Sequence, residues 1–419
     1  MRVLCTATGS PSHGRALLPL ARALAGAGHE VTVVTTADVA PVFAADPVRV
    51  EPSLPRIDFT TPEEQEADGE GADARAAAAA VEQTGATPDA DPDADPAEHP
   101  HMRVLMERLT GDMAREHHRV LSELAREFRP DAIIRDGMDM GACLLAEQLG
   151  IPQLPIPAGT VNILDPAVAL PALNRLREEL GLPVQEEPGS LYPHGRFDYL
   201  PAEYSFARFP ATVLAYRQTT VVDRTAGLPG WVAELPADRP LVFAAVGTAM
   251  PMFREILPAG TPLPVGMTDP SEILATIIAG LSRLECTAVV ATGGVEPAGG
   301  VEPAPHVHLT DRLAQPLLLE CADLFVTHGG YNSIREAVRT GTPMAVLPNF
   351  GDQLPNAARV QELGLGRHLT DTDPDAVAAV CRELLADRET AARCRRAQLA
   401  SLALPDIGQV VADLEKLVA

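Results

Sequence analysis

The sequence predicts an α/β protein of two doubly wound, Rossmann-like domains that face a central cleft. Both halves of the 419-residue chain alternate short apolar strands with amphipathic helices, which is typical of parallel sheets covered by helices on both faces. The length fits two domains of roughly 200 residues each. We therefore expect an N-terminal domain at 1–216, a linker at 217–240, a second domain at 241–400 and a C-terminal helix within 401–419 that could pack back onto the first domain.

The first domain is expected to begin with a strand, a loop, a helix and a second strand. Residues 2–8 form the strand, the loop runs from Gly9 to Gly14, and leucines at helical spacing predict a helix that ends near Gly28. The second strand is 31–34. The loop has no GxGxxG spacing and no acidic residue directly closes the second strand, so the sequence does not predict a nicotinamide-binding site.

The rest of the first domain is less regular. Residues 61–100 are acidic, rich in Pro, Ala and Gly and free of aromatic side chains, which predicts a mobile excursion without a core. A helical pattern at 102–128 precedes a strand at 132–136 and a helix at 139–149. Residues 156–215 contain many prolines, and we expect them to be irregular.

The second domain repeats the alternation of strands and helices. Its expected strands are 241–246, 288–292, 306–310, 323–327 and 344–348. The expected helices are 271–284, 333–340, 353–363, 374–386, 389–400 and a last one around 407–418. Ligands of open parallel sheets bind outside the carboxyl ends of the strands, so both domains could present these ends to one cleft.

A strand that ends in His-Gly-Gly precedes an amphipathic helix in the segment THGGYNSIREAVRTGTP, residues 327–343. The backbone amides of Tyr331, Asn332 and Ser333 then lie at a helix N-terminus, where unpaired N–H groups and the helix dipole favour an anion. Ser333 and Glu336 also fit a capping box, in which the two side chains satisfy each other's backbone amides. The segment therefore predicts an anion site or a helix cap, and the two can coexist.

Polar residues follow other expected strands of the second domain as well. They are Gly247 and Thr248, Gln315, His328 to Ser333 with Glu336, and Asp352 with Gln353. Their order and spacing resemble the nucleotide-sugar-dependent glycosyltransferases of the GT-B fold, above all the natural-product enzymes that act on macrolides and aromatic polyketides. The resemblance covers nearly the whole chain. It departs from the common pattern at Leu313-Ala314-Gln315, where the family often has Val/Thr-Pro-Gln, and at Tyr331-Asn332, where small residues are frequent.

The resemblance implies that the second domain binds a UDP- or dTDP-sugar. The residues implied to hold it are Gly247, Thr248, Gln315, His328, Gly329, Gly330, Asn332, Ser333, Glu336, Asp352 and Gln353. The helix N-terminus and His328 would hold the diphosphate, and the glycines would let the backbone approach it. Gln315 would meet the pyrimidine edge, because an amide both donates and accepts hydrogen bonds. Glu336 would bind ribose hydroxyls, and Asp352 and Gln353 would bind sugar hydroxyls.

The first domain is implied to bind the acceptor and to supply the catalytic base. His13, in the loop after the first strand, matches the family's base, since an imidazole with a pKa near neutrality can take the proton of an attacking hydroxyl. Asp136 matches the carboxylate that orients the imidazole, and Asp139 is the alternative. The implied reaction is inverting, metal-independent transfer of a hexose or deoxyhexose to a hydroxyl of a small hydrophobic aglycone. A GT-B-fold sugar-nucleotide epimerase or hydrolase and a non-catalytic sugar-nucleotide-binding homologue are the alternatives.

Composition limits the partners of the chain. The net charge of −24 argues against nucleic acid and anionic membrane surfaces, both of which attract basic proteins. No apolar stretch approaches the ~20 residues that span a bilayer, and the cysteines are scattered without metal-ligand spacing. His117 and His118 are expected to be solvated and not to bind metal. We expect a cytoplasmic monomer or homodimer of antibiotic biosynthesis that uses a nucleotide sugar and an aglycone, with no cofactor or metal.

Overall fold

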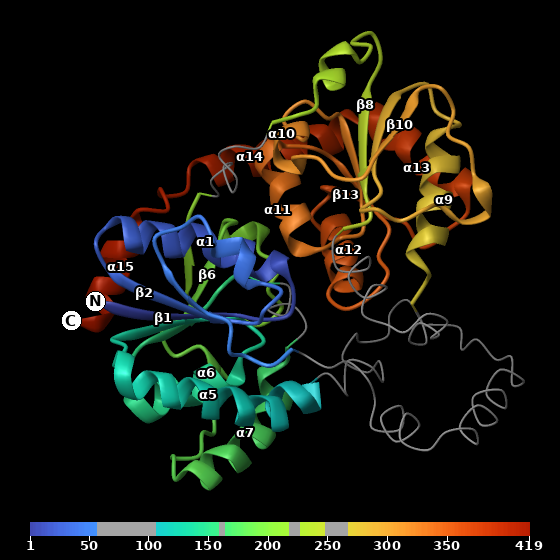
Figure 1. Ribbon diagram of the computed structural model, residues 1–419. Helices are drawn as coiled ribbons and strands as arrows, with labels where there is room; N and C mark the ends of the chain where they lie inside the picture. Colours follow the sequence, from blue (N-terminus) through green and yellow to red (C-terminus); the bar gives the residue numbers. More distant parts are fainter. Residues whose placement is uncertain (57–105, 159–163, 218–226, 248–266) are drawn as a thin grey trace, which may run out of the picture.

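The computed structural model describes residues 1–56, 106–158, 164–217, 227–247 and 267–419. These residues form two main parallel sheets with helices on both faces, one sheet in each half of the chain (Figure 1). The predicted pair of doubly wound domains is therefore confirmed. The expected excursion at 61–100 and the predicted ligand Thr248 lie outside the described residues. No helix of the described part of the chain is long and apolar enough to cross a membrane.

The first domain contains a five-stranded parallel sheet in the order β3-β2-β1-β4-β5. Its strands are β1 (Arg2–Ala7), β2 (Glu30–Thr35), β3 (Arg49–Glu51), β4 (Ala132–Arg135) and β5 (Gln153–Pro155). The helices that cover it are α1 (Pro11–Gly26), α5 (Asp112–Phe128) and α6 (Met140–Leu149). Val3 and Cys5 pack in the core with α1, whereas Leu4 packs in the core with α5 and α6, because successive residues of a strand point to opposite faces.

The second domain contains a six-stranded parallel sheet in the order β10-β9-β8-β11-β12-β13. Its strands are β8 (Leu241–Ala245), β9 (Thr287–Ala291), β10 (Val307–Thr310), β11 (Leu324–Thr327), β12 (Met344–Val346) and β13 (Gly366–His368). Its helices are α9 (Pro270–Leu281), α10 (Gln315–Leu318), α11 (Tyr331–Thr340), α12 (Gln353–Glu362), α13 (Pro374–Ala386) and α14 (Arg388–Leu402). Helices α9 and α13 bury one face of the sheet, and α10, α11, α12 and α14 bury the other.

One helix and several short strands differ from the prediction. Residues 156–215, expected to be irregular, contain α7 (Pro166–Leu180). Asp165 caps this helix by accepting the amide of Ala167, and Pro166 occupies the first turn, where a missing N–H costs nothing. The expectation was therefore wrong in this part, because one of its prolines starts a helix. Strands β3, β5 and β13 were also missed, since three residues are too few to show a periodicity.

The segment after α7 joins the cores of the two domains. It contains two short parallel strands, β6 (Arg196–Asp198) and β7 (Val213–Ala215). Phe197 and Tyr199 are buried in the core of the first domain. Leu200 and Phe206 are instead buried in the core of the second domain, with residues of α11 and α14. This single stretch therefore fixes one domain against the other.

The C-terminal helix α15 (Gln409–Val418) returns to the first domain (Figure 1). Val410 and Leu414 are buried in the core that includes α1. The Tyr216 hydroxyl donates a hydrogen bond to Asp413 Oδ2 at 2.9 Å. The C-terminal helix thus packs into the core of the N-terminal domain.

Candidate functional site

Two reversals of strand order determine where the candidate residues lie. In the first sheet β1 pairs with both β2 and β4, and in the second sheet β8 pairs with both β9 and β11. Loops diverge at such a point and leave a binding crevice outside the carboxyl ends of the two central strands. His13 and Asp136 follow β1 and β4. Gly247 and His328 follow β8 and β11.

His13 and Asp136 form the hydrogen-bonded pair that the sequence predicts. His13 Nδ1 lies 2.8 Å from Asp136 Oδ2, and the His13 side chain is 16% exposed whereas the carboxylate is wholly buried. The carboxylate also accepts the backbone amides of Thr8 at 2.8 Å and Met138 at 3.0 Å. A carboxylate can only accept hydrogen bonds, so Nδ1 carries a proton and Nε2 is the nitrogen that can take a proton from a ligand.

The pKa of His13 reflects both domains. Burial alone would lower this pKa, but the charge and hydrogen bond of Asp136 outweigh that effect and raise it above the ordinary value. Asp352, in the second domain, raises it further. Burial raises the pKa of Asp352 in turn, and the hydrogen bond from Asn356 and the charge of His13 oppose that rise. His13 of the first domain therefore lies within electrostatic reach of Asp352, a predicted sugar ligand of the second domain.

A second histidine–carboxylate pair uses Asp139, three residues after Asp136. His117 of α5 is wholly buried, and its Nδ1 lies 3.2 Å from Asp139 Oδ1, which also caps α6 by accepting the amide of Ala142. His118 is buried too and bonds Gln148 at 2.9 Å. The expectation that both histidines are solvated is therefore wrong, because helix α5 turns them toward α6. Asp139 is engaged by His117, which leaves Asp136 as the partner of His13.

Helix α11 begins at Tyr331 with Gly330 as its N-cap, and no side chain caps it. The amides of Tyr331, Asn332 and Ser333 are therefore the first three of the helix and have no partner within it. The capping-box alternative is wrong, because Ser333 lies inside the helix and its hydroxyl bonds a side chain of α10. The N-terminus of α11 thus has the amides and the dipole of an anion-binding site.

Three predicted nucleotide ligands lie together where α10 meets α11. Gln315 Nε2 donates to Ser333 Oγ at 3.1 Å and to Glu336 Oε2 at 2.7 Å. Burial raises the pKa of Glu336, and the hydrogen bond from Gln315 opposes that rise. The cluster offers amide, hydroxyl and carboxyl groups in one place, which suits a base edge and ribose hydroxyls.

His328 packs between two glycines. A Cβ on Gly247 would lie 2.5 Å from the imidazole, and a Cβ on Gly330 would lie 2.4 Å from its Nε2, so only glycine fits at either position. Gly247 also has a φ of +82°, which favours glycine. Burial lowers the pKa of His328 to about 4, so the ring is neutral at physiological pH. Its Nδ1 is buried without a hydrogen-bond partner in the described part of the chain, and a ligand could supply one.

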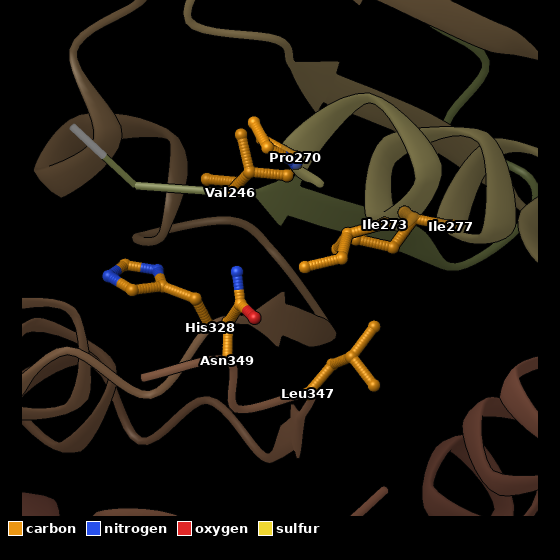
Figure 2. A pocket seen from close by; sticks show the side chains of 8 residues that line it. Val246, Pro270, Ile273, Ile277, His328, Leu347 and Asn349 are labelled. Carbon is orange, nitrogen blue, oxygen red and sulfur yellow. The ribbon is translucent and has the colours of Figure 1, made fainter. Parts of the chain in front are cut away.

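A pocket lies beside His328 at the carboxyl ends of β8, β11 and β12 (Figure 2). Its lining consists of Ala245, Val246, Pro270, Ile273, Ile277, His328, Leu347 and Asn349. Asn349 is held by two hydrogen bonds with the backbone of Thr268, at 2.8 and 2.9 Å. Most of the lining is apolar, and a hydrogen bond from the imidazole to a ligand is stronger there than in water.

Asp352 and Gln353 lie at the start of α12. Gln353 Oε1 accepts two backbone amides of the preceding loop. Asn356 Nδ2 donates to Asp352 Oδ2 at 2.8 Å and to the carbonyl of Gly329 at 2.9 Å. These bonds connect Asp352, which is predicted to bind the sugar, to the loop before α11. The sequence analysis missed Asn356. Its spacing of four residues from Asp352 on one helix was the available signal.

Two Rossmann-like domains whose candidate site residues lie at the carboxyl ends of the central strands are typical of the GT-B class, and known proteins agree with this fold assignment. Residues 276–417 match the C-terminal domain of the erythromycin biosynthesis protein CIII-like family. The chain is similar to macrolide and polyketide glycosyltransferases, so the predicted resemblance is confirmed.

Several relatives are sugar transferases of bacteria. The chain is 27% identical to the L-demethylnoviosyl transferase of Streptomyces niveus, with 94% of this chain and 93% of the relative covered. It is 27% identical to the NDP-glycosyltransferase YjiC of Bacillus licheniformis, with 71% and 76% covered. A shorter match, 25% of each chain, is 39% identical to the oleandomycin glycosyltransferase of Streptomyces antibioticus.

Solved structures share the fold over the whole chain. The spinosyn rhamnosyltransferase SpnG has a TM-score of 0.71 at 19% identity, with 99% of this chain and all of that chain covered. The glycosyltransferase VinC, in complex with dTDP, has a TM-score of 0.68 at 21% identity, with 100% and 99% covered. Both support the GT-B architecture of this chain.

Proposed function

We propose that this protein is an inverting, metal-independent glycosyltransferase that moves a hexose or deoxyhexose from a UDP- or dTDP-sugar to a hydroxyl of a small hydrophobic natural-product aglycone. One observation carries the proposal. The His13–Asp136 pair of the first domain and the sugar-side residue Asp352 of the second lie close enough to shift each other's titration. A proton acceptor and a sugar site so placed suit the attack of an acceptor hydroxyl on a bound sugar.

His13 acts as the general base in this proposal. Its Nε2 takes the proton of the acceptor hydroxyl, and Asp136 holds the imidazole in the required tautomer and stabilises the imidazolium. The hydroxyl oxygen forms a bond to the anomeric carbon while the bond from that carbon to the phosphate oxygen breaks. The electron pair leaves with the nucleoside diphosphate. Attack from the side opposite the diphosphate inverts the configuration of the anomeric carbon.

The second domain stabilises the leaving group. In this proposal the amides at the N-terminus of α11 and the imidazole of His328 stabilise the charge that develops on the diphosphate. Such fixed dipoles can neutralise the leaving group without a metal ion. In this proposal Gln315, at the start of α10, and Glu336, within α11, hold the base and ribose ends, while Asp352 and Gln353, at the start of α12, hold the sugar.

The names of the relatives support the substrate classes. SpnG has been solved with thymidine diphosphate and with the spinosyn aglycone, and VinC with dTDP. The relative of Streptomyces niveus transfers L-demethylnoviose. We therefore place dTDP-deoxysugars beside UDP-hexoses as candidate substrates and polyketide-like aglycones as candidate acceptors.

The proposal is tested by incubating the purified protein with dTDP- and UDP-sugars and a panel of aglycones in the presence of a chelator. We expect a glycosylated product whose anomeric configuration, read by NMR coupling constants, is opposite to that of the nucleotide sugar. Incubation without acceptor tests the alternative classes. Sugar release or epimerisation at a rate that an aglycone does not change would favour the hydrolase or epimerase alternative, and retained configuration would exclude the proposed mechanism.

We expect His328→Ala and Gln315→Ala each to weaken the binding of UDP or dTDP by about 10-fold or more. The first removes the proposed hydrogen bond to the charged diphosphate, and the second removes the proposed hydrogen bonds to the pyrimidine edge. Isothermal titration calorimetry with the free nucleoside diphosphates measures this loss. His306→Ala is the matched control, since this half-buried histidine instead bonds the carbonyl of Leu281. If both variants bind the nucleotides as tightly as the parent does, the nucleotide site lies elsewhere.

A further inference from the structure

The first residues of α11 contact the helix that carries the base. Asn332 Nδ2 donates to the carbonyl of Ser12 at 2.7 Å, although the two residues are 320 positions apart in the sequence. Ser12 is the residue directly before His13 in the first turn of α1. The anion-binding end of one domain is therefore joined to the base-bearing turn of the other by a direct hydrogen bond.

Tyr331, the residue before Asn332, makes a second connection. Its hydroxyl donates to Asp198 Oδ1, and both side chains are buried. Asp198 is held in turn by Arg196, whose guanidinium donates to Oδ2 at 2.9 Å, and by the backbone amide of Tyr199 at 2.8 Å. The carboxylate therefore remains paired and fixed even without the tyrosine hydroxyl.

Tyr199 completes the path back to α1. Its hydroxyl donates to the carbonyl of Ala16 at 2.6 Å, one helical turn after the base. The guanidinium of Arg335, one turn along α11 from Tyr331, lies 4.5 Å from the centre of the Tyr199 ring. Two connections thus run between α11 and α1, one direct and partly buried, the other buried and passing through the segment after β6.

We propose that these contacts form an α1–α11 tie that positions His13 against the anomeric carbon of the bound sugar. The α1–α11 tie consists of Ser12, Ala16, Asp198, Tyr199, Tyr331, Asn332 and Arg335. The diphosphate is held by the N-terminus of α11, so the position of the anomeric carbon follows that helix. The position of the base follows the first turn of α1. A displacement of about 1 Å between reacting groups costs about 10²-fold in rate, so a direct tie between these two helices determines the rate of transfer more than the affinity for either substrate.

The inference rests on the proposed function and gives a role to the Tyr331-Asn332 pair, at which the sequence departs from the small residues frequent in the family. Tyr331 is a positioning residue because its hydroxyl bonds Asp198 of the first domain, and Tyr199 is one because its hydroxyl bonds the carbonyl of Ala16 in α1. Asn332 donates its amide to Ser12, so it also belongs to the tie, beside its predicted place in the nucleotide site.

The test compares Tyr331→Phe with Tyr216→Phe. Each variant removes one buried or partly buried hydroxyl that donates to an aspartate, but the Tyr216–Asp413 bond joins the end of β7 to α15 and lies outside the tie. For Tyr331→Phe we expect kcat of transfer to fall by about 10-fold, with the Kd of the nucleoside diphosphate and the KM of the acceptor nearly unchanged. For Tyr216→Phe we expect a similar loss of thermal stability and no change in kcat.

Amide hydrogen exchange of the protein without ligand gives a readout that does not depend on transfer. Exchange in the 12–18 segment of α1 is expected to speed up in Tyr331→Phe and to match the parent in Tyr216→Phe. Unchanged exchange together with parental kcat in Tyr331→Phe overturns the tie. An equal fall of kcat in both tyrosine variants also overturns it, because the effect would then be general destabilisation. Faster exchange in a protein that transfers no sugar would instead support the tie and contradict the proposed function.

Discussion

His13→Ala is expected to lower the rate of sugar transfer by ~10²–10⁴-fold while leaving the affinity for UDP and dTDP unchanged. The imidazole is the exposed member of a buried pair and acts on the acceptor hydroxyl, whereas the nucleotide ligands all lie in the second domain. Steady-state kinetics with a saturating nucleotide sugar measures the first quantity, and calorimetric titration measures the second.

A matched variant separates loss of the base from loss of structure. His368→Ala removes a histidine from the edge strand β13, and we expect it to transfer sugar at the parental rate. Thermal unfolding of both variants shows whether either is destabilised. A turnover of His13→Ala within a few-fold of the parent, with normal stability, would remove His13 from the mechanism and leave no assigned base.

Asp136→Asn is expected to lower kcat by about 10²-fold and to shift the pH dependence of the remaining activity. Only neutral His13 can accept a proton, so the rate falls on the acid side as the imidazole becomes protonated. Asp136 raises the pKa of His13 against the effect of burial. Without the charge of Asp136 the effect of burial dominates, and the pKa of His13 falls. The acid limb of the kcat/KM profile therefore moves to lower pH, while the plateau of the profile is lower than in the parent.

The Asp136→Asn substitution also has a structural cost that has to be measured. The Asp136 carboxylate accepts the backbone amides of Thr8 and Met138, and the amide nitrogen of an asparagine side chain cannot accept either of them. A loss of about 1–3 kcal/mol in the free energy of unfolding is therefore expected. Asp139→Asn is the comparison, since that carboxylate bonds His117 and caps α6. An acid limb that moves in Asp139→Asn but not in Asp136→Asn would reassign the partner of the base.

Much of the site could be predicted because it depends on short segments next to strands. Apolar runs and helical periodicity predict the alternation of strands and helices. The doubly wound sheet then places the ends of β1 and β4 side by side. That adjacency brings His13 and Asp136 together although 123 residues separate them, and the resemblance implied their pairing, with Asp139 as the alternative. The His-Gly-Gly segment likewise predicts an anion site from local geometry alone, since a strand followed by glycines and a helix leaves amides unpaired.

Features that depend on packing across the chain could not be predicted in this way. Ser333 and Glu336 match a capping box in the sequence, but the helix begins two residues before Ser333 and both side chains bond Gln315. His117 appears among charged residues that suggest solvent, yet α5 turns its side chain into the contact with α6. In each case several local partners satisfy the same side chain, and the energy of tertiary packing selects among them.

The sequence by itself determined the two domains, the strand ends where the candidate site residues lie, and residue types suited to nucleotide-sugar chemistry. The tertiary structure alone decided how the domains meet: Asn332 bonds Ser12, Tyr331 bonds Asp198, and residues after β6 pack into both cores. The physical reason is that local patterns report hydrophobic periodicity and backbone preference, which act over a few residues. A hydrogen bond between segments 133 or 320 positions apart has no local signal, and only the packed chain brings its partners together.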